Sequence, residues 1–347
     1  MAPLRVDLRD CRYRAMIGVG GIGSGVFFAL HSNHTLGREE SRGGRFLDRR
    51  DYCKLHIISH YVKILLGPEF EVIPIGKVGD DNPGHRLLDE MQEAGLDLRH
   101  VQVSPGDDTL HSICLVYPDG SGGNLTTDDS ACTKVDSSFV AHAQTEFSRY
   151  AGRGVTLSAP EVPLEARAKL LEMGTDHGFF RVAAFVSAEM RPAIEAGMLQ
   201  QTDLLAANID EAAAAAGMPL GARDPASVVE AAIARLRDLK DDMLISITAG
   251  KEGSWSWDGE TLAHVPAFPA EAVSTAGAGD AHLSGIIAGL VADLTLSQAQ
   301  ELATLVAALS ITSPHTIHPG VERSSLRGLA SQMQVRLSDP VERLLGD

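Results

Sequence analysis

Short apolar runs alternate with segments of helical periodicity along most of the chain, and the two patterns predict alternating strands and helices. The expected strands include residues 15–20, 71–75, 155–158, 180–186, 204–207 and 243–248. The expected helices include residues 47–66, 83–94, 164–173, 226–239, 278–292 and 297–313. Such alternation is typical of an α/β fold, with a mostly parallel central sheet and helices on both faces.

Two regions, residues 26–45 and 98–129, interrupt this alternation. They are richer in Gly, Ser and Thr and in short strand-like runs, so we expect them to form a small β lid at the edge of the sheet. The sequence shows no internal repeat, low-complexity tract or long linker. Residues 1–347 are therefore predicted to form a single domain that carries this lid.

Composition and charge exclude several classes of function. The formal net charge of −16 repels phosphate backbones, so no nucleic-acid partner is expected. No stretch reaches 18 apolar residues and the first residues lack an apolar leader, which predicts a cytoplasmic protein without a membrane partner. The cysteines show no metal-binding spacing and are expected to be free thiols; they are Cys11, Cys53, Cys114 and Cys132.

The candidate chemistry lies in residues 275–280, just before an apolar helix. Glycines allow a tight turn, and free N–H groups at the start of a helix form an anion site. An aspartate cannot itself help to bind a phosphate, so Asp280 suggests a base that accepts a proton from an attacking hydroxyl. The alternative is a simple capping turn in which Asp280 interacts with the helix dipole.

Residues 274–280 are similar to the signature Asp-Thr-x-Gly-Ala-Gly-Asp of the ribokinase-like (PfkB) carbohydrate kinases. Other segments resemble motifs of that family in the same order: residues 75–84, 95–97, the turn Asp119-Gly120, 208–211, 248–253 and 303–312. The resemblance implies a ribokinase-like fold. It also implies ATP-dependent phosphoryl transfer to a hydroxyl of a sugar, polyol or nucleoside.

The resemblance further implies a role for each matching residue. Asp280 would be the catalytic base, and the amides of Gly277, Ala278 and Gly279 would form an anion hole. Asn208 and Glu211 would hold Mg²⁺ through water, although the same pair also fits a helix cap with an acidic first turn. The expected nucleotide contacts are Asn208, Thr248, Gly250, Gly253 and Thr275. Lid strands in this family often pair, so a homodimer through the lid is expected.

Two departures from the family pattern affect the cation and the substrate. Ser274 replaces the first Asp of the signature, so little activation by a monovalent cation is expected. The run Gly20–Gly25 stands where the family has Gly-Asn-x-x-x-Asp, whose Asp binds sugar hydroxyls, and it has neither Asn nor Asp. Gly43 and Gly44 match the later glycine pair and, with Asn33 from a polar run at 33–42, are the expected substrate contacts.

Two other classes of function remain open on the sequence. Residues 18–23 satisfy the G-x-G-x-x-G pattern after a strand, which would suit an NAD-dependent oxidoreductase. The apolar segment that follows is too short for the helix of a dinucleotide-binding unit. A non-catalytic relative that binds a sugar or nucleotide is the other alternative, and the retained Asp280 argues against it.

Overall fold

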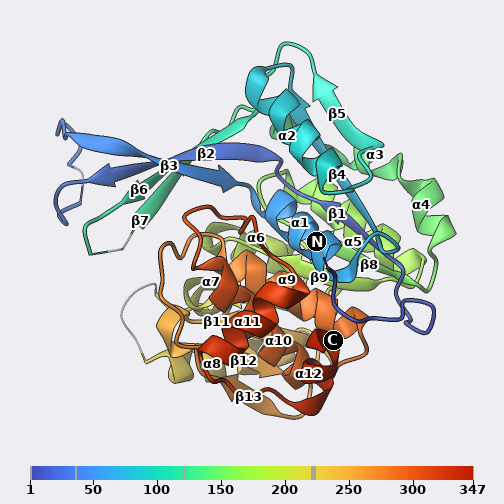
Figure 1. The fold of residues 1–347 in the computed structure, drawn as a ribbon. Coiled ribbons are helices and arrows are strands. Elements are labelled where there is room, and N and C mark those ends of the chain that lie inside the picture. Colours follow the sequence, from blue (N-terminus) through green and yellow to red (C-terminus); the bar gives the residue numbers. More distant parts are fainter. Residues whose placement is uncertain (1, 36, 120–121, 220–223, 347) are drawn as a thin grey trace.

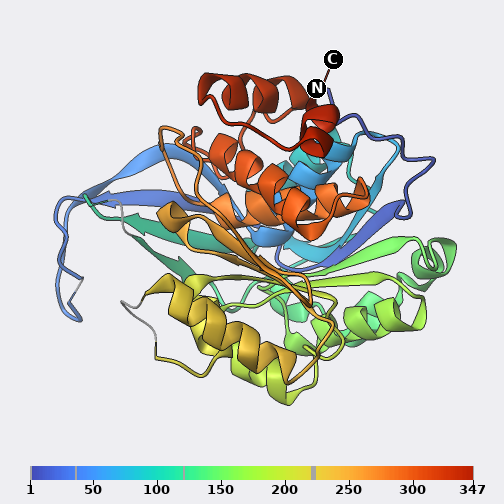
Figure 2. The same cartoon turned by 90° about the horizontal axis from the view of Figure 1, so that it is seen from below.

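The computed structural model describes residues 2–35, 37–119, 122–219 and 224–346. Its centre is a nine-stranded sheet in the order β13-β12-β11-β10-β9-β8-β1-β4-β5. Strands from β5 to β11 along this order pair in parallel, while β12 and β13 are antiparallel at one edge. Helices cover both faces of the sheet (Figure 1 and Figure 2), which confirms the predicted α/β class.

The strands of this sheet are β1 (Ala15–Val19), β4 (Glu71–Gly79), β5 (His100–Ser104), β8 (Gly154–Ser158), β9 (Phe180–Ala184), β10 (Leu204–Asn208), β11 (Leu244–Thr248), β12 (Ser254–Trp257) and β13 (Leu262–Val265). The α-helices are α1 (Lys54–Leu66), α2 (Asn82–Glu93), α3 (Ser137–Ala141), α4 (Gln144–Arg149), α5 (Leu164–Asp176), α6 (Ser187–Glu195), α7 (Ile209–Ala215), α8 (Pro225–Arg237), α9 (Ala278–Val291), α10 (Leu296–Ser310), α11 (Arg323–Gln332) and α12 (Asp339–Leu345).

Strand β1 shows why the central strands read as continuous apolar runs. Met16 contributes to the core beneath α1, α9 and α10, whereas Ala15, Ile17 and Val19 contribute to the core on the opposite face, beneath α3–α5. Every side chain of the strand is therefore buried, which is the pattern of a parallel strand covered on both faces.

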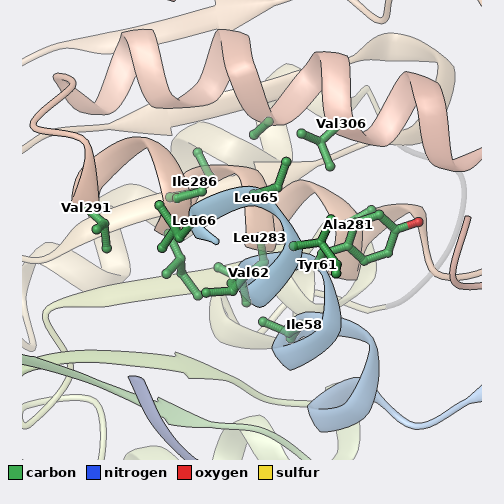
Figure 3. Packing of buried hydrophobic residues seen from close by; sticks show 14 of the residues in the cluster. Ile58, Tyr61, Val62, Leu65, Leu66, Ala281, Leu283, Ile286, Val291 and Val306 are labelled. Atoms are coloured by element: carbon green, nitrogen blue, oxygen red, sulfur yellow. The ribbon is translucent and has the colours of Figure 1, made fainter. Parts of the chain in front are cut away.

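Helix α1 packs directly against α9 within the first of these cores. Figure 3 shows Ile58, Val62 and Leu65 of α1 beside Leu283 and Ile286 of α9, and all of these side chains are buried. Because α1 begins at Lys54 and α9 begins at Ala278, this packing brings the N-terminal ends of two helices to one side of the sheet.

The second sheet is the expected lid. It has four strands in the order β3-β2-β6-β7 and projects from the body (Figure 1). Its strands are β2 (Gly23–Leu30), β3 (Gly44–Tyr52), β6 (Leu110–Val116) and β7 (Gly122–Thr126). Strand β5 pairs with β4 in the central sheet, so the second part of the lid begins near residue 110 rather than at 98. Gly120 of the expected lid turn lies outside the described residues.

The prediction of one long helix over residues 47–66 is wrong in its first third. Residues up to Tyr52 belong to β3, which pairs antiparallel with β2, and only the part from Lys54 onward is helical. No glycine or proline marks the change, so the local pattern could not reveal it. Pairing with β2, which lies far upstream in the chain, decides the conformation.

Two further observations concern surface and redox chemistry. No helix among the described residues is both long and apolar enough to cross a membrane. All four cysteines are free thiols, and three of them are buried.

Candidate active site

The carboxyl ends of two neighbouring strands carry the first site residues. Asn208 ends β10 and Thr248 ends β11, and the parallel register places the two residues side by side. Gly279 and Asp280, from the first turn of α9, line the same cavity of about 50 Å³. Lys54, Glu211, Ser246 and His282 complete its polar lining. Five predicted site residues therefore line one cavity at the carboxyl edge of the sheet, where open α/β sheets bind ligands: Asn208, Glu211, Thr248, Gly279 and Asp280.

The turn before α9 depends on Gly277. This residue has φ 77°, a left-handed conformation, and a Cβ placed on it would lie 2.9 Å from the carbonyl oxygen of Thr316. The N–H groups of Gly277 and Gly279 have no hydrogen-bond partner among the described residues, whereas Ala278 donates to the carbonyl of Thr275 at 3.2 Å. Two of the three predicted amides are therefore free to bind an anion at the start of a helix.

Asp280 follows these amides in the first turn of α9 and lines the cavity. Burial raises the pKa of Asp280 to about 6; Lys54 acts to lower it, and Glu211 and Asp51 act to raise it. A carboxyl group with a pKa close to neutrality is a suitable general base, because it is ionised at neutral pH and still basic enough to accept a proton.

Lys54 is a cation that the sequence analysis did not single out. It is the first residue of α1, and its Nζ lies 3.5 Å from Oε1 of Glu211. Burial acts to lower the pKa of Lys54, but Asp280, Glu211 and Glu161 outweigh this effect and raise it. The side chain therefore places a fixed positive charge among three carboxylates.

Asn208 and Glu211 form the N-terminal cap of α7, as the structural alternative predicted. Oδ1 of Asn208 accepts the N–H groups of Asp210 and Glu211, each at 2.9 Å, and Oε2 of Glu211 accepts the N–H of Asn208 at 2.8 Å. Both lone pairs of Asn208 Oδ1 are then used. The other carboxylate oxygen of Glu211, Oε1, is turned toward Lys54 at the cavity.

This geometry tests the fit of a magnesium ion. Direct ligation by Asn208 does not fit, because its carbonyl oxygen is occupied. Contact through water does fit: Glu211 can accept hydrogen bonds from a metal-bound water, and Mg²⁺ usually retains several waters. The described residues contain no group of three or more His, Cys, Asp or Glu side chains that could hold a metal.

The nucleotide segment after β11 is a short 3₁₀ turn over Gly250–Glu252. Gly250 is exposed with φ 56°, beside the strand end that carries Thr248. Gly253 has φ 89°, and a Cβ there would lie 2.2 Å from the carbonyl oxygen of Val265. Gly253 therefore shapes the backbone of this edge, while Gly250 presents an open backbone surface. Thr275 is exposed at the start of the glycine turn.

The three expected substrate contacts lie elsewhere in the lid. Gly44 pairs with Leu30 at one end of β3, whereas Tyr52 pairs with Ser24 at the other end, next to α1. Eight residues separate the two ends, or about 26 Å along a strand. Asn33 lies beyond β2 and accepts a hydrogen bond from the amide of Asp119 at 3.1 Å. The structure therefore does not bring Gly43, Gly44 and Asn33 to the cavity beside Asp280.

Acidic residues missed in the sequence lie closer to the site. Glu161 follows β8 with φ 75°, and burial raises its pKa to about 7. Its Oε2 is buried without a hydrogen-bond partner among the described residues. Asp51, near the end of β3, affects the pKa of Asp280. Polar residues that follow parallel strands gather at one edge of a sheet, and this rule could have identified Glu161, which follows β8. It could not have identified Asp51, which lies within a lid strand.

The dinucleotide-binding interpretation of residues 18–23 is wrong. That motif requires a helix whose N-terminus faces the pyrophosphate. Here β1 is followed at once by strand β2, which begins at Gly23 and belongs to the lid. The glycines instead allow close packing, since a Cβ on Gly20 would lie 2.7 Å from Cβ of Ala159.

Comparison with curated proteins finds similar sugar kinases. The chain is 27% identical over 252 residues to the ATP-dependent ribose-1-phosphate kinase of Halopiger xanaduensis, covering 71% of this chain and 76% of that protein. It is 25% identical over 250 residues to the fructoselysine 6-kinase of Shigella flexneri, covering 67% and 80%. A shorter match, 44% identical over 57 residues, covers 16% of this chain and 18% of the uncharacterized sugar kinase YegV of Escherichia coli.

Solved structures show the same fold at lower sequence identity. Ribokinase from Giardia lamblia superposes with a TM-score of 0.77 at 17% identity, covering 91% of this chain and 99% of that one. The nucleoside kinase of Burkholderia thailandensis, solved with inosine, gives a TM-score of 0.70 at 16% identity, covering 93% and 99%. The ribokinase-like fold is therefore established. Residues 63–323 match the pfkB family of carbohydrate kinases, and the chain belongs to this family.

Proposed function

We propose that the protein transfers the γ-phosphoryl group of ATP to a hydroxyl of a sugar or nucleoside, with Asp280 as the general base. The observation that carries this proposal is the position of the Asp280 carboxylate directly after a glycine turn with two free amides, at the N-terminus of α9. A base and an anion site so close together suit attack of a hydroxyl on a phosphoryl group.

In the proposed reaction, Asp280 accepts the proton of the acceptor hydroxyl as its oxygen bonds to the γ-phosphorus. The bond from that phosphorus to the β–γ bridging oxygen breaks, and ADP leaves with the bond electrons. The amides of Gly277 and Gly279 stabilise the charge on the migrating group, with the amide of Ala278 joining if it turns from Thr275. Lys54 adds a positive charge at the same cavity.

The nucleotide would lie along the ends of β10 and β11. Asn208 and Thr248 end these strands, Gly250 and Gly253 belong to the turn after β11, and Thr275 is exposed at the start of the glycine turn. Mg²⁺, held through water by Glu211, would neutralise phosphate charge when bound, while the carbonyl oxygen of Asn208 stays in the helix cap.

Replacement of the base tests the proposal. Asp280→Asn should lower turnover by about 10²- to 10⁴-fold, measured as ADP release with ATP, Mg²⁺ and a panel of sugars and nucleosides, and should keep ATP affinity. Asp242→Asn is the matched control, because Asp242 is exposed just before β11, at the opposite end of that strand. Activity of Asp280→Asn equal to that of the control would contradict a base at this position.

The same assay separates a kinase from a non-catalytic relative. ATP binding by the wild type without ADP release on the whole panel would favour a binding protein on the same fold.

A homodimer through the lid is also proposed. Phe46 on β3 is 68% exposed and Leu125 on β7 is 60% exposed, and both are large apolar side chains on lid strands. Burying these side chains against a second copy would remove apolar surface from water.

A further inference from the structure

The middle of the lid contains an unusual arrangement around Gly25. This glycine lies on β2, directly opposite Asp51 on β3 and directly opposite Ser112 on β6. The two flanking side chains meet across it, because Oγ of Ser112 donates to Oδ2 of Asp51 at 2.9 Å. A Cβ on Gly25 would lie 2.5 Å from this carboxylate oxygen and 2.2 Å from the hydroxyl. The Asp51 carboxylate therefore fills the space that a side chain at position 25 would need.

The Asp51 carboxylate is only partly satisfied by the protein. Its Oδ2 accepts hydrogen bonds from Ser112 Oγ and from Cys114 Sγ at 3.1 Å, while Oδ1 has no partner among the described residues. Burial, followed by the charge of Asp51, raises the pKa of Cys114, so the thiol stays protonated as a donor. Asp51 is only 8% exposed, and a carboxylate offers about four acceptor positions. A further hydrogen-bond donor would stabilise this buried charge.

The end of β3 is tied to the glycine turn. The N–H of Tyr52 donates to Oγ1 of Thr316 at 3.2 Å, and the carbonyl oxygen of Thr316 is the atom that a Cβ on Gly277 would approach. The charge of Asp51 is close enough to act on Asp280. Asp51 therefore lies on the lid side of the base, whereas Thr248 and Asn208 lie on the strand ends of the body.

We infer that Asp51 binds a hydroxyl of the acceptor, next to the hydroxyl that is phosphorylated. This inference rests on the proposed kinase function and deepens it by naming a substrate-binding residue. The carboxylate accepts from the substrate hydroxyl through Oδ1, and Ser112 and Cys114 hold it in place through Oδ2. A side chain at position 25 would clash with the carboxylate of Asp51, so in this part of the lid the acid comes from β3 and not from β2. The substrate class is a polyhydroxylated acceptor with adjacent hydroxyls.

Substitution of Asp51 gives the first test. Asp51→Asn should raise the KM for the acceptor by roughly 10- to 100-fold, the loss expected for a hydrogen bond to a charged group, while KM for ATP stays within about twofold. Asp48→Asn, an exposed acid on the same strand, is the matched control and should behave like wild type. Ser112→Ala keeps the carboxylate but removes one of its donors, and should raise the acceptor KM only a few-fold.

Deoxy acceptors distinguish binding from a structural role. D-ribose and inosine, with their 2-deoxy and 3-deoxy (2′-deoxy and 3′-deoxy) analogues, are the probes. The analogue that lacks the hydroxyl bound by Asp51 should bind more weakly to wild type, and Asp51→Asn should weaken it no further. A purely structural Asp51 would instead weaken every analogue by the same factor and lower the melting temperature, and this result would overturn the inference.

Calorimetry without ATP separates the two proposals. If the wild type binds the acceptor but shows no turnover, and Asp51→Asn binds it more weakly, the binding role of Asp51 is supported and the kinase function is contradicted. Turnover in wild type with an unchanged acceptor KM in Asp51→Asn would contradict only the role of Asp51. A wild type that neither binds nor phosphorylates any probe would overturn both.

Discussion

Two strands of equal length show how different the two sheets are. Strand β1 of the central sheet is buried at all five positions, whereas strand β7 of the lid is exposed at all five. The first is covered by helices on both faces, and the second lies at the edge of a sheet that projects from the body (Figure 1). Packing on both faces can therefore fix the positions of site residues in the body, whereas substitutions at exposed lid positions should affect folding little.

The departure that affects the substrate follows this division. The turn at Gly277 and the proposed base Asp280 belong to the body and match the family signature. The run Gly20–Gly25, which leads into the lid, lacks the expected acid, and Asp51 supplies a carboxylate from the neighbouring lid strand. We infer that the phosphoryl-transfer chemistry was kept in the body and that substrate contacts were rearranged in the lid.

A matched pair of isoleucines would test this contrast most strongly. Ile17→Ala on β1 should lower the free energy of unfolding by about 2–5 kcal/mol, because it opens a cavity in a fully buried core. Ile113→Ala on β6, where the side chain is 36% exposed, should cost less than about 1 kcal/mol. Urea denaturation measures both, and equal losses would contradict the division into a tight body and a loose lid.

The glycine turn is the next strongest test. Gly277→Ala should reduce turnover by about 100-fold and cost about 1–3 kcal/mol of stability, because a Cβ meets Thr316 at positive φ. The control is Gly279→Ala, whose Cβ would have nothing nearer than 3.9 Å and whose stability should stay close to wild type. Steady-state kinetics and thermal melting separate the two effects; a fully active Gly277→Ala would rule out the need for this turn.

The pH profile links the body to the lid. Because burial raises the pKa of Asp280 to about 6 and the base must be ionised, kcat/KM should fall about tenfold per pH unit below pH 6. Asp51→Asn should move the inflection to lower pH, since it removes a negative charge, and Lys54→Met should move it to higher pH. An inflection that is insensitive to both substitutions would show that another group controls the profile.

Exposed apolar residues of the lid should affect assembly more than stability. Phe46→Ser combined with Leu125→Ser is expected to convert a dimer into a monomer in sedimentation experiments, with a change in unfolding free energy within about 0.5–1 kcal/mol. An unchanged sedimentation coefficient would mean that the lid surface does not hold two copies together.

The smallest effect is expected from potassium. Ser274 offers no carboxylate, and its N–H donates to the carbonyl of Ile311 at 3.2 Å. K⁺ should therefore stimulate turnover less than about twofold over Na⁺ at equal ionic strength, and Ser274→Asp is the variant in which stimulation could appear. Strong K⁺ activation of the wild type would contradict this expectation.

The sequence by itself determined the layered α/β body and the turn at residues 277–280. Central strands appear as continuous apolar runs, and helices show apolar residues at a spacing of three to four residues. A glycine turn followed by an apolar helix involves only a few consecutive residues, so it is visible locally. The capping role of Asn208 and Glu211 was also readable, because a cap and its third helical residue are close in sequence.

Only the tertiary structure decided where the lid begins and which acid lies opposite Gly25. In the sequence, the end of β3 and the start of α1 share one helix-like pattern without a break. Pairing with β2 makes the first part a strand and leaves only the second part helical. The register that sets Asp51 opposite Gly25 joins residues far apart along the chain. Lys54 at the start of α1 reaches Glu211 in the first turn of α7 only in the folded chain. Such contacts depend on long-range packing, which no local period or motif encodes.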